Sequence, residues 1–277
     1  MAATDGNTGE SFTRFFQEIR HGARRQASVI FALIFKEFKS RSGRDSRLGM
    51  LWIILDPMTQ VITMTAMWLL AGRLEVNGVN VALFIAIGTA PYTVAHLSLT
   101  SIPKALAANR LFYNYQQVKP IDSFIAEFIL EISLMLIGEV LIFAILWWFF
   151  GLTFDLGAIL PLLSLFGLAM VLGFGLGLMA ATYGTRFDTV KKLLSFTSRP
   201  LMILSAVFYT LNDLPPPARY FLSWNPLVHI IEYARYYAFG LKLFPEASLT
   251  YAVMFALVAL FLGFVCYYPN RLRLIEQ

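Results

Sequence analysis

Long runs of hydrophobic residues alternate with short polar connections along most of this chain. A helix needs about 20 apolar residues to cross the roughly 30 Å hydrocarbon core of a bilayer. Six stretches meet or approach that length, at residues 50–72, 81–101, 126–150, 157–182, 194–212 and 248–268. The pattern predicts an all-α integral membrane protein with six transmembrane helices, formed by residues 48–268.

The fifth stretch is the least regular of the six. Its uncharged part, residues 200–212, would rise only about 20 Å as a helix, which is too short to cross. Extending it back to Leu194 supplies the missing length, but adds Arg199 and a kink at Pro200. We expect Arg199 to reach the cytoplasmic headgroups.

The beginning of the chain follows a different pattern. Residues 1–10 are small and polar, and we expect a disordered tail there. Over residues 11–47, Phe, Ile and Leu recur at helical spacing with Arg and Lys between them. A basic helix with a Phe-rich face is typical of an amphipathic helix lying on the cytoplasmic membrane surface. A signal peptide is disfavoured because KEFKSR follows the apolar run from Val29, without a small-residue cleavage site.

The basic residues predict the orientation. Of the 22 Lys and Arg residues, eighteen precede the first stretch, follow the last, or lie in the second and fourth connections. The remaining ones are Arg73, Arg219, Arg235 and Lys242. Because cytoplasmic segments carry the excess of Lys and Arg, both termini are expected inside, including the tail at residues 269–277.

Composition supports this assignment and excludes other classes. The chain is 58% hydrophobic and 14% charged, against roughly 25% charged in ordinary soluble domains. The net charge of +5 does not indicate nucleic-acid binding, because the positive residues gather at the ends of apolar runs. The single cysteine, Cys266, lies inside such a run, so no disulfide or zinc site is expected.

The sequence gives no support to an enzyme. It contains no Gly-x-x-x-x-Gly-Lys loop for ATP, and neither His-Glu-x-x-His nor Gly-x-Ser-x-Gly. The three histidines are scattered at His21, His96 and His229. A hydrogen-bonded packing role for His96 is favoured over a place on a polar path.

The second cytoplasmic connection, residues 104–123, combines aromatic and amide residues. Phe112, Tyr113 and Tyr115 follow one another closely before Pro120 ends the segment. Clustered aromatics on such a loop suit a protein-docking knob. An aromatic anchor at the membrane surface explains them equally well.

Three acidic residues lie in the third stretch, at Glu127, Glu131 and Glu139. The first two are near its cytoplasmic end, while Glu139 is deeper and is expected to face protein or water. A proton relay through them would make the chain a proton-coupled secondary transporter. That alternative predicts internal repeats, which the sequence lacks.

The last outer connection, residues 213–247, is too apolar for a solvated loop and too interrupted to span. Two short helices that enter the membrane and return fit it best, where protein or a water-filled cavity satisfies the backbone. Asn225 is a suitable N-cap, with Pro226 at the first helical position and Gly240 as the left-handed C-cap.

These caps predict a 14-residue helix at 226–239. Glu232 and Arg235 are three residues apart on one face of this helix and are expected to pair. If the pair alone matters, exchanging the two charges restores part of what single substitutions remove.

Two further patterns predict packing and not a site. Ala169, Gly173, Gly177 and Ala181 recur every four residues and allow close helix approach. Trp147, Trp148, Phe149 and Phe150 end the third stretch as an aromatic belt.

Two motifs resemble a known family. One is Arg-x-x-x-x-Leu-Gly-x-Leu-Trp-x-x-x-Asp-Pro, at Arg44, Leu48, Gly49, Leu51, Trp52, Asp56 and Pro57. The other is NPLVHIIEYAR at 225–235. Together with the overall pattern they are similar to the permease subunits of ABC exporters, most of all to capsule polysaccharide export permeases of Gram-negative bacteria. O-antigen and teichoic-acid permeases share the first motif and stay as alternatives.

The resemblance implies a homodimer with two ATPase subunits, which would bind ATP and Mg²⁺ while this chain binds no cofactor. It implies a lipid-linked, acidic polysaccharide substrate in the bacterial inner membrane, and leaves room for periplasmic and outer-membrane export proteins as partners. It makes the first and fifth spans the walls of the path. The segment that couples to the ATPase would comprise Asn109, Arg110, Leu111, Phe112, Tyr113 and Tyr115.

Two more sets of site residues are expected. The surface helix would form a lateral substrate entrance, with basic residues at headgroup level that attract anionic groups. The entrance set is Arg44, Arg47, Trp52, Asp56, Lys191, Lys192 and Arg199. The pore and re-entrant set is Glu139, Asn225, Pro226, Glu232 and Arg235.

Overall fold

The computed structural model is mostly helical, at 82%. It describes residues 6–42, 49–115, 117–153, 155–184, 192 and 200–276. Its long helices are α1 (Gly6–Ser42), α2 (Gly49–Leu70), α3 (Val81–Ala108), α4 (Pro120–Phe150), α5 (Ile159–Gly184) and α9 (Leu249–Asn270). The short ones are α7 (Pro216–Leu222), α8 (Pro226–Phe239), α10 (Arg273–Glu276), η1 (Arg110–Asn114), η2 (Leu156–Ala158) and η3 (Leu211–Asp213). Two strands, β1 (Glu75–Val76) and β2 (Val79–Asn80), form a hairpin.

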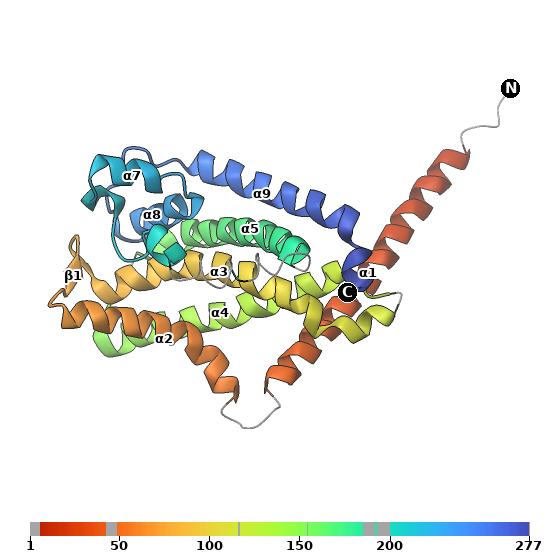
Figure 1. The fold of residues 1–277 in the computed structure, drawn as a ribbon, viewed down its shortest axis with the longest axis horizontal. Coiled ribbons are helices and arrows are strands. Elements are labelled where there is room, and N and C mark those ends of the chain that lie inside the picture. Colours follow the sequence, from red (N-terminus) through yellow and green to blue (C-terminus); the bar gives the residue numbers. More distant parts are fainter. Residues whose placement is uncertain are drawn as a thin grey trace.

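The centre of the molecule is a bundle of α3, α4, α5 and α9 (Figure 1). In the described part of the chain, these four are the helices long and apolar enough to cross a membrane, α5 being counted from Leu156. Helix α2 packs on α3 and α4, and its described apolar part is the shorter stretch Met58–Leu70. The prediction of a mostly helical, multi-span protein is therefore confirmed, with four strongly apolar candidate spans among the described residues.

The stripe of small residues on α5 serves close packing, as predicted. A Cβ atom at Gly173 would lie 2.8 Å from Ala95 Cα, and one at Gly177 would lie 2.6 Å from the Ser98 carbonyl oxygen, both on α3. Gly175 lies between them on the side of α9, where a Cβ atom would be 2.5 Å from the Ala259 carbonyl carbon. Any side chain at these positions would separate the helices.

The fifth apolar stretch does not continue as a helix to residue 212, so that prediction was wrong in its second half. Residues 200–204 are helical, and the chain then turns through residues 205–209 before η3. Ala206 takes the left-handed conformation, with φ of 56°, which L-residues other than Asn and Asp rarely adopt. Contacts from α8, described below, hold this turn.

The hairpin between α2 and α3 was not predicted, although the sequence carries its signal. Val76 pairs with Val79, so Asn77 and Gly78 form the two-residue turn. Both have positive φ, 53° and 80°, as a type I′ turn requires, and Asn-Gly is its preferred sequence. Asn80 then caps α3 by accepting a hydrogen bond from the Ala82 N–H at 2.9 Å.

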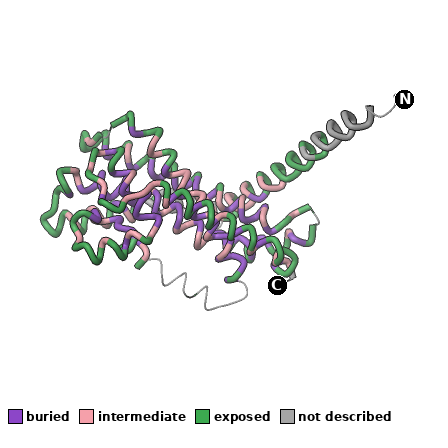
Figure 2. Tube along the Cα trace, turned by 90° about the horizontal axis from the view of Figure 1, so that it is seen from above, coloured by how far each residue is buried: buried purple, intermediate pink, exposed green. Residues whose placement is uncertain are grey.

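Helix α1 crosses one end of the bundle and extends beyond it (Figures 1 and 2). The helix begins at Gly6, so residues 6–10, expected as a disordered tail, are helical. Along the part that contacts the bundle, Leu33 is buried at 4% exposure, while Phe31 and Phe35 are 70% and 62% exposed. The helix therefore presents an apolar face away from the bundle.

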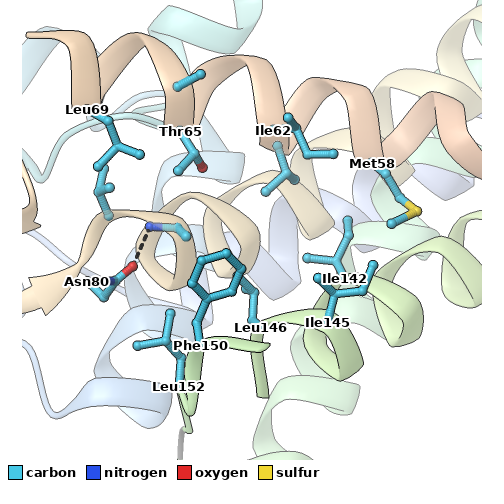
Figure 3. Close-up of a pocket in the computed structure, with 14 residues that line it drawn as sticks. Met58, Ile62, Thr65, Leu69, Asn80, Ile142, Ile145, Leu146, Phe150 and Leu152 are labelled. Carbon is cyan, nitrogen blue, oxygen red and sulfur yellow. Dashed lines mark hydrogen bonds between the residues drawn. The ribbon is translucent and has the colours of Figure 1, made fainter. Parts of the chain in front are cut away.

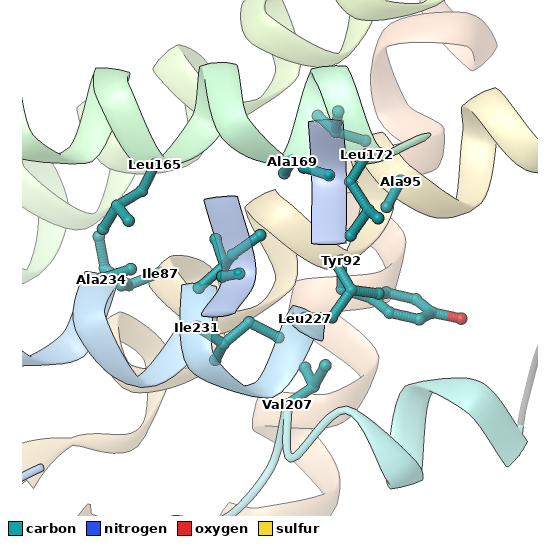
Figure 4. Close-up of a cluster of buried hydrophobic side chains, with 14 of the residues drawn as sticks. Ile87, Tyr92, Ala95, Leu165, Ala169, Leu172, Val207, Leu227, Ile231 and Ala234 are labelled. Carbon is teal, nitrogen blue, oxygen red and sulfur yellow. The ribbon is translucent and has the colours of Figure 1, made fainter. Parts of the chain in front are cut away.

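Helix α8 lies inside the molecule. Its Leu227, Ile231 and Ala234 pack in one buried cluster with side chains of α3 and α5 (Figure 4). Val207, from the turn after residue 204, completes this contact. The apolar character of residues 226–239 is explained by burial on neighbouring helices.

Candidate functional site

The connection between α3 and α4 exposes part of the predicted coupling segment. Leu111 and Tyr115 are 80% and 65% exposed, Arg110 is also exposed, and Phe112 is half-buried. Tyr113 is buried at 7% and Asn109 at 3%. The surface available to a partner therefore includes Arg110, Leu111, Asn114 and Tyr115.

The two buried residues anchor this segment to the bundle. Tyr113 packs in a cluster with side chains of α3, α4, α5 and α9. Asn109 donates from Nδ2 to the Ala105 carbonyl at 3.0 Å, and its Oδ1 accepts from Lys36 Nζ of α1 at 3.1 Å. The segment is thus a rigid projection, because its own polar and aromatic side chains attach it at the base.

Helix α1 is attached to the bundle by an ion-pair cluster. Arg41 donates to Glu127 at 2.5 Å and to Glu131 at 3.0 Å, both on α4, and to Glu37 of its own helix at 3.4 Å. Ser101 of α3 adds a hydrogen bond to Glu131 at 3.1 Å. Two of the three acids suggested for a proton relay are therefore engaged in holding α1.

Sequence analysis missed this cluster. The available signal was the charge balance: two carboxylates near a membrane boundary need a cation, and Arg41 is one of the basic residues that precede the first apolar stretch. A second contact supports the attachment, because Gln26 of α1 donates to Asp122 at the start of α4 at 2.8 Å.

Glu139 lies deeper on α4, away from the Arg41 cluster. It is 7% exposed, and its Oε2 has no hydrogen-bond partner among the residues that the structure describes. An unpaired carboxylate at this position is costly as an anion. Among the described residues, no contact to Oε2 therefore explains why the chain carries a carboxylate here.

The predicted caps of α8 are confirmed. Asn225 accepts a hydrogen bond from the Leu227 N–H at 3.0 Å, Pro226 is the first helical residue, and Gly240 takes the left-handed conformation with φ of 68°. A second amide contact runs from Asn225 Nδ2 to Ser205 Oγ at 3.0 Å. Asn225 therefore links the start of α8 to the turn at residues 205–209.

Glu232 and Arg235 form the predicted pair, with Nη1 and Oε1 3.4 Å apart and both side chains buried. This contact is longer than the hydrogen bonds that Arg235 makes to backbone carbonyls. Arg235 Nη1 donates to the carbonyls of Ala206 and Tyr209 at 2.9 Å each, and Nη2 donates to Val207 at 2.5 Å. One guanidinium thus satisfies three carbonyls of the turn, which lacks helical N–H partners for them.

The surroundings of Arg235 are shaped to hold it. Its guanidinium carbon lies 3.8 Å from the ring centroid of Phe84, on α3. Gly88, one turn further along, leaves the necessary space, because a Cβ atom there would lie 2.6 Å from Arg235 Nη2. Phe84, Gly88 and Arg235 therefore form one packed unit.

An apolar groove lies between α2, the start of α3 and the end of α4 (Figure 3). Its volume is about 470 Å³. Met58, Ile62 and Leu69 of α2 face Ile142, Ile145 and Phe150 of α4 across it. No charged residue is found among the described residues that line it, so this groove offers a surface for hydrocarbon and few partners for a sugar.

The predicted substrate entrance falls largely outside the described residues. Arg44, Arg47, Lys191 and Arg199 are among the residues that the structure does not describe. The side chains of Trp52 and Asp56, in α2, are likewise outside the description. Lys192 is described and is exposed.

The chain is similar to known transport proteins over most of its length. Residues 28–239 match the model of the ABC-2 type transporter family. The chain is 30% identical over 249 residues to the polysialic acid transport protein KpsM of Escherichia coli, covering 90% of this chain and 95% of the relative. It is 26% identical over 243 residues to the capsule polysaccharide export inner-membrane protein BexB of Haemophilus influenzae (87% and 90%). It is 27% identical over 242 residues to the corresponding protein CtrC of Neisseria meningitidis (86% and 89%).

The family match covers the part of α1 that carries Arg41, helices α2 to α5, and α8 with its Arg235 contacts, and it ends before α9. It extends over more than three quarters of the chain and agrees with several long apolar helices and with a sequence that lacks a P-loop. The protein is a multi-pass membrane protein that belongs to the ABC-2 type transporter family.

Proposed function

We propose that this chain is the permease subunit of an ABC exporter that moves a lipid-linked, acidic capsular polysaccharide across the bacterial inner membrane. The observation that carries the proposal is the similarity to KpsM, which runs through 95% of that protein's length. ATP, with Mg²⁺, is hydrolysed by a separate ATPase, because this sequence has no P-loop.

The permease acts as a dimer with two ATPase subunits and has six spans. Its two remaining spans are α2 and the helix that includes residues 200–204, and both line the path. Both termini face the cytoplasm, as the eighteen cytoplasmic basic residues favour. Periplasmic and outer-membrane export proteins are its partners beyond the inner membrane.

The exposed residues of η1 couple the permease to the ATPase. Leu111 and Tyr115 project from a base that Tyr113 and Asn109 attach to the bundle, so a force on the segment is transmitted to α3 and α4. Phe31 and Phe35 on the outer side of α1 support an interfacial position for that helix. Helix α8 is the re-entrant element, since its 14 residues rise only about 21 Å.

Deleting the gene in the producing cell tests the function. We expect capsular polymer to disappear from the cell surface and to accumulate inside, and the intact gene to restore export. The double variant Leu111→Ala/Tyr115→Ala should insert normally and fail to restore it. Normal surface polymer in the deletion strain would contradict the proposal.

A further inference from the structure

A second cavity lies at the opposite end of the bundle from η1. It is bounded by the end of α2, the β1–β2 hairpin and the segment at residues 208–213. Its volume is about 550 Å³, within the roughly 300–1,000 Å³ of small-molecule sites. We call it the outer pocket. Unlike the apolar groove of Figure 3, it has a mixed lining of aromatic, charged and amide side chains.

Three aromatic side chains line the outer pocket: Trp68 from α2, and Phe208 and Tyr209 from the turn before η3. All three are half-buried, so part of each remains accessible. The guanidinium carbon of Arg73 lies over the Trp68 ring, 5.0 Å from its centroid, so this cation takes one face of the indole and the opposite face is the one that can stack on a ligand. Aromatic faces next to a cavity provide stacking surfaces for flat, partly apolar ligands such as sugar rings.

Polar groups complete the lining. Arg73 and Glu75 are exposed, and neither forms an ion pair or a side-chain hydrogen bond with any residue that the structure describes. Asp213 accepts from Thr210 Oγ1 at 2.8 Å and from Asn77 Nδ2 at 3.4 Å. Arg73 and Glu75 therefore offer one donor group and one acceptor group to a ligand.

Hydrogen bonds from Arg235 and from Asn77 hold the walls of the outer pocket in position. Arg235 donates to the carbonyls of Val207 and Tyr209, on both sides of Phe208. Asn77, in the hairpin turn, donates to Thr210 Oγ1 at 3.1 Å and so joins the hairpin to the other wall. The buried arginine of α8 thereby sets the position of two aromatic residues at the surface.

The charges of the lining argue against recognition of the polymer through its carboxylates. Glu75 and Asp213 outnumber Arg73, so the carboxylate of an acidic polymer meets a net negative surface. Carboxylates and a guanidinium are, in contrast, strong hydrogen-bond partners for neighbouring hydroxyls. Three aromatic faces together with such groups fit a sugar ring presented by its hydroxyls and its C–H face.

We propose that the outer pocket binds a sugar residue of the exported polymer, by stacking on Trp68 and Phe208 and by hydroxyl contacts to Arg73 and Glu75. This inference rests on the proposed function. It adds a contact at the outer ends of the two segments assigned to the path, α2 and the helix that ends at residue 204. Weak, charge-independent binding there lets the polysaccharide advance one sugar at a time without being retained.

The test uses the full chain in lipid nanodiscs, with six-sugar fragments of the producing cell's capsular polymer as the probe. Dissociation constants are measured by saturation-transfer NMR at low and high salt. We expect Trp68→Leu and Phe208→Leu each to weaken binding by at least about tenfold. Binding by the parent chain should not fall with salt, and hexaglutamate, an anion without sugar rings, should not bind.

Matched variants use aromatic residues at the same end of the molecule but outside the pocket. Trp224 and Phe221 are 68% and 71% exposed, so Trp224→Leu and Phe221→Leu should change binding by less than about twofold. If a pocket variant unfolds, the exposed hairpin variants Arg73→Ala and Glu75→Ala replace it, and each should weaken binding.

Three results would overturn the inference: no binding of the fragments to the parent chain, parent-like affinity in the pocket variants, or affinity that drops with salt. Loss of a periplasmic protein partner from the pocket variants, with sugar binding intact, would also overturn it. Capsular polymer on the cell surface is also measured in strains that carry each of these variants. Normal export by a chain that binds no fragment refutes only the outer pocket, whereas export that is independent of the chain refutes the function.

Discussion

Arg235 forms an ion pair with Glu232 and also binds the backbone of the turn at residues 205–209. Its side chain is fully buried, and three of its hydrogen bonds go to carbonyls at residues 206, 207 and 209. The structure thus changes the expectation for exchanging the charges. A glutamate at position 235 has no donors for those carbonyls, so the pair cannot simply be reversed.

We predict that Arg235→Gln lowers the free energy of unfolding by about 3–5 kcal/mol, because it removes a buried charge from a buried partner. Glu232→Gln should cost less, since Arg235 keeps its three carbonyl acceptors in that variant. Thermal unfolding of the purified chain in detergent measures both. Arg219→Gln is the control, because its pair with Glu246 is half-exposed and worth at most about 1 kcal/mol.

The double variant Glu232→Arg/Arg235→Glu should be at least as unstable as Arg235→Gln. Recovery of half the lost stability by this exchange would show that the ion pair, and not the three carbonyls, dominates. The local chemistry of α8 was predictable from sequence, because caps and i,i+3 pairs depend on nearby residues. The carbonyl contacts were not, because they join residues 26 to 29 positions apart.

At the scale of elements, η1 separates two roles that look alike in sequence. Tyr113 and Tyr115 are two residues apart, yet one is 7% and the other 65% exposed. We predict that Leu111→Ala/Tyr115→Ala reduces binding of the ATPase by about 2 kcal/mol or more and leaves the fold intact, as expected for exposed anchors of an interface.

Tyr113→Ala is the matched aromatic variant and should mainly destabilise the permease. Co-purification of the ATPase and the melting temperature of the permease are measured for both variants. A Leu111→Ala/Tyr115→Ala variant that retains its ATPase would contradict the docking role. The sequence could not divide the cluster, because only the tertiary contacts with α4, α5 and α9 bury Tyr113.

Arg41 forms the ion pairs that attach helix α1 to α4. Charge-assisted hydrogen bonds are worth about 1.5–3 kcal/mol each, so Arg41→Gln should increase local opening of α1. We predict faster amide hydrogen exchange along residues 26–42 and unchanged exchange in α5. Lys39→Gln, at an exposed position of the same helix, is the control. Unchanged protection of α1 in Arg41→Gln would show that its other contacts, including Gln26 with Asp122 and Lys36 with Asn109, are sufficient to hold it.

At the scale of the whole molecule, the sequence correctly predicted a helical membrane protein, its long apolar helices and the close packing of α5. It missed the hairpin and overextended the fifth stretch. Periodicity and length identify helices that face lipid, because the bilayer imposes the same requirement on each. The turn at residues 205–209 follows from the position of Arg235 in the folded bundle, which no local pattern encodes.

The orientation remains a prediction from the basic residues. Single cysteines replacing Asn77, Asp155 and Asn212 should react with an impermeant thiol reagent in intact cells, and those replacing Asn114 and Asp188 should react only after lysis. All are made in a Cys266→Ser background. The hydrogen bond from Asn77 to Thr210 requires the first and last outer connections to be on one side, so labelling of position 77 without position 212 would contradict the topology.

The most direct test of the account is the ATP hydrolysis rate of the complex that co-purifies with this chain. The complex is placed in nanodiscs, and the rate is measured with and without lipid-linked capsular polysaccharide. The account predicts a co-purifying ATPase whose rate rises with the glycolipid, and no rise in the complex that carries Leu111→Ala/Tyr115→Ala. A chain that purifies without an ATPase, or an ATPase indifferent to the glycolipid, would contradict the assignment as an export permease.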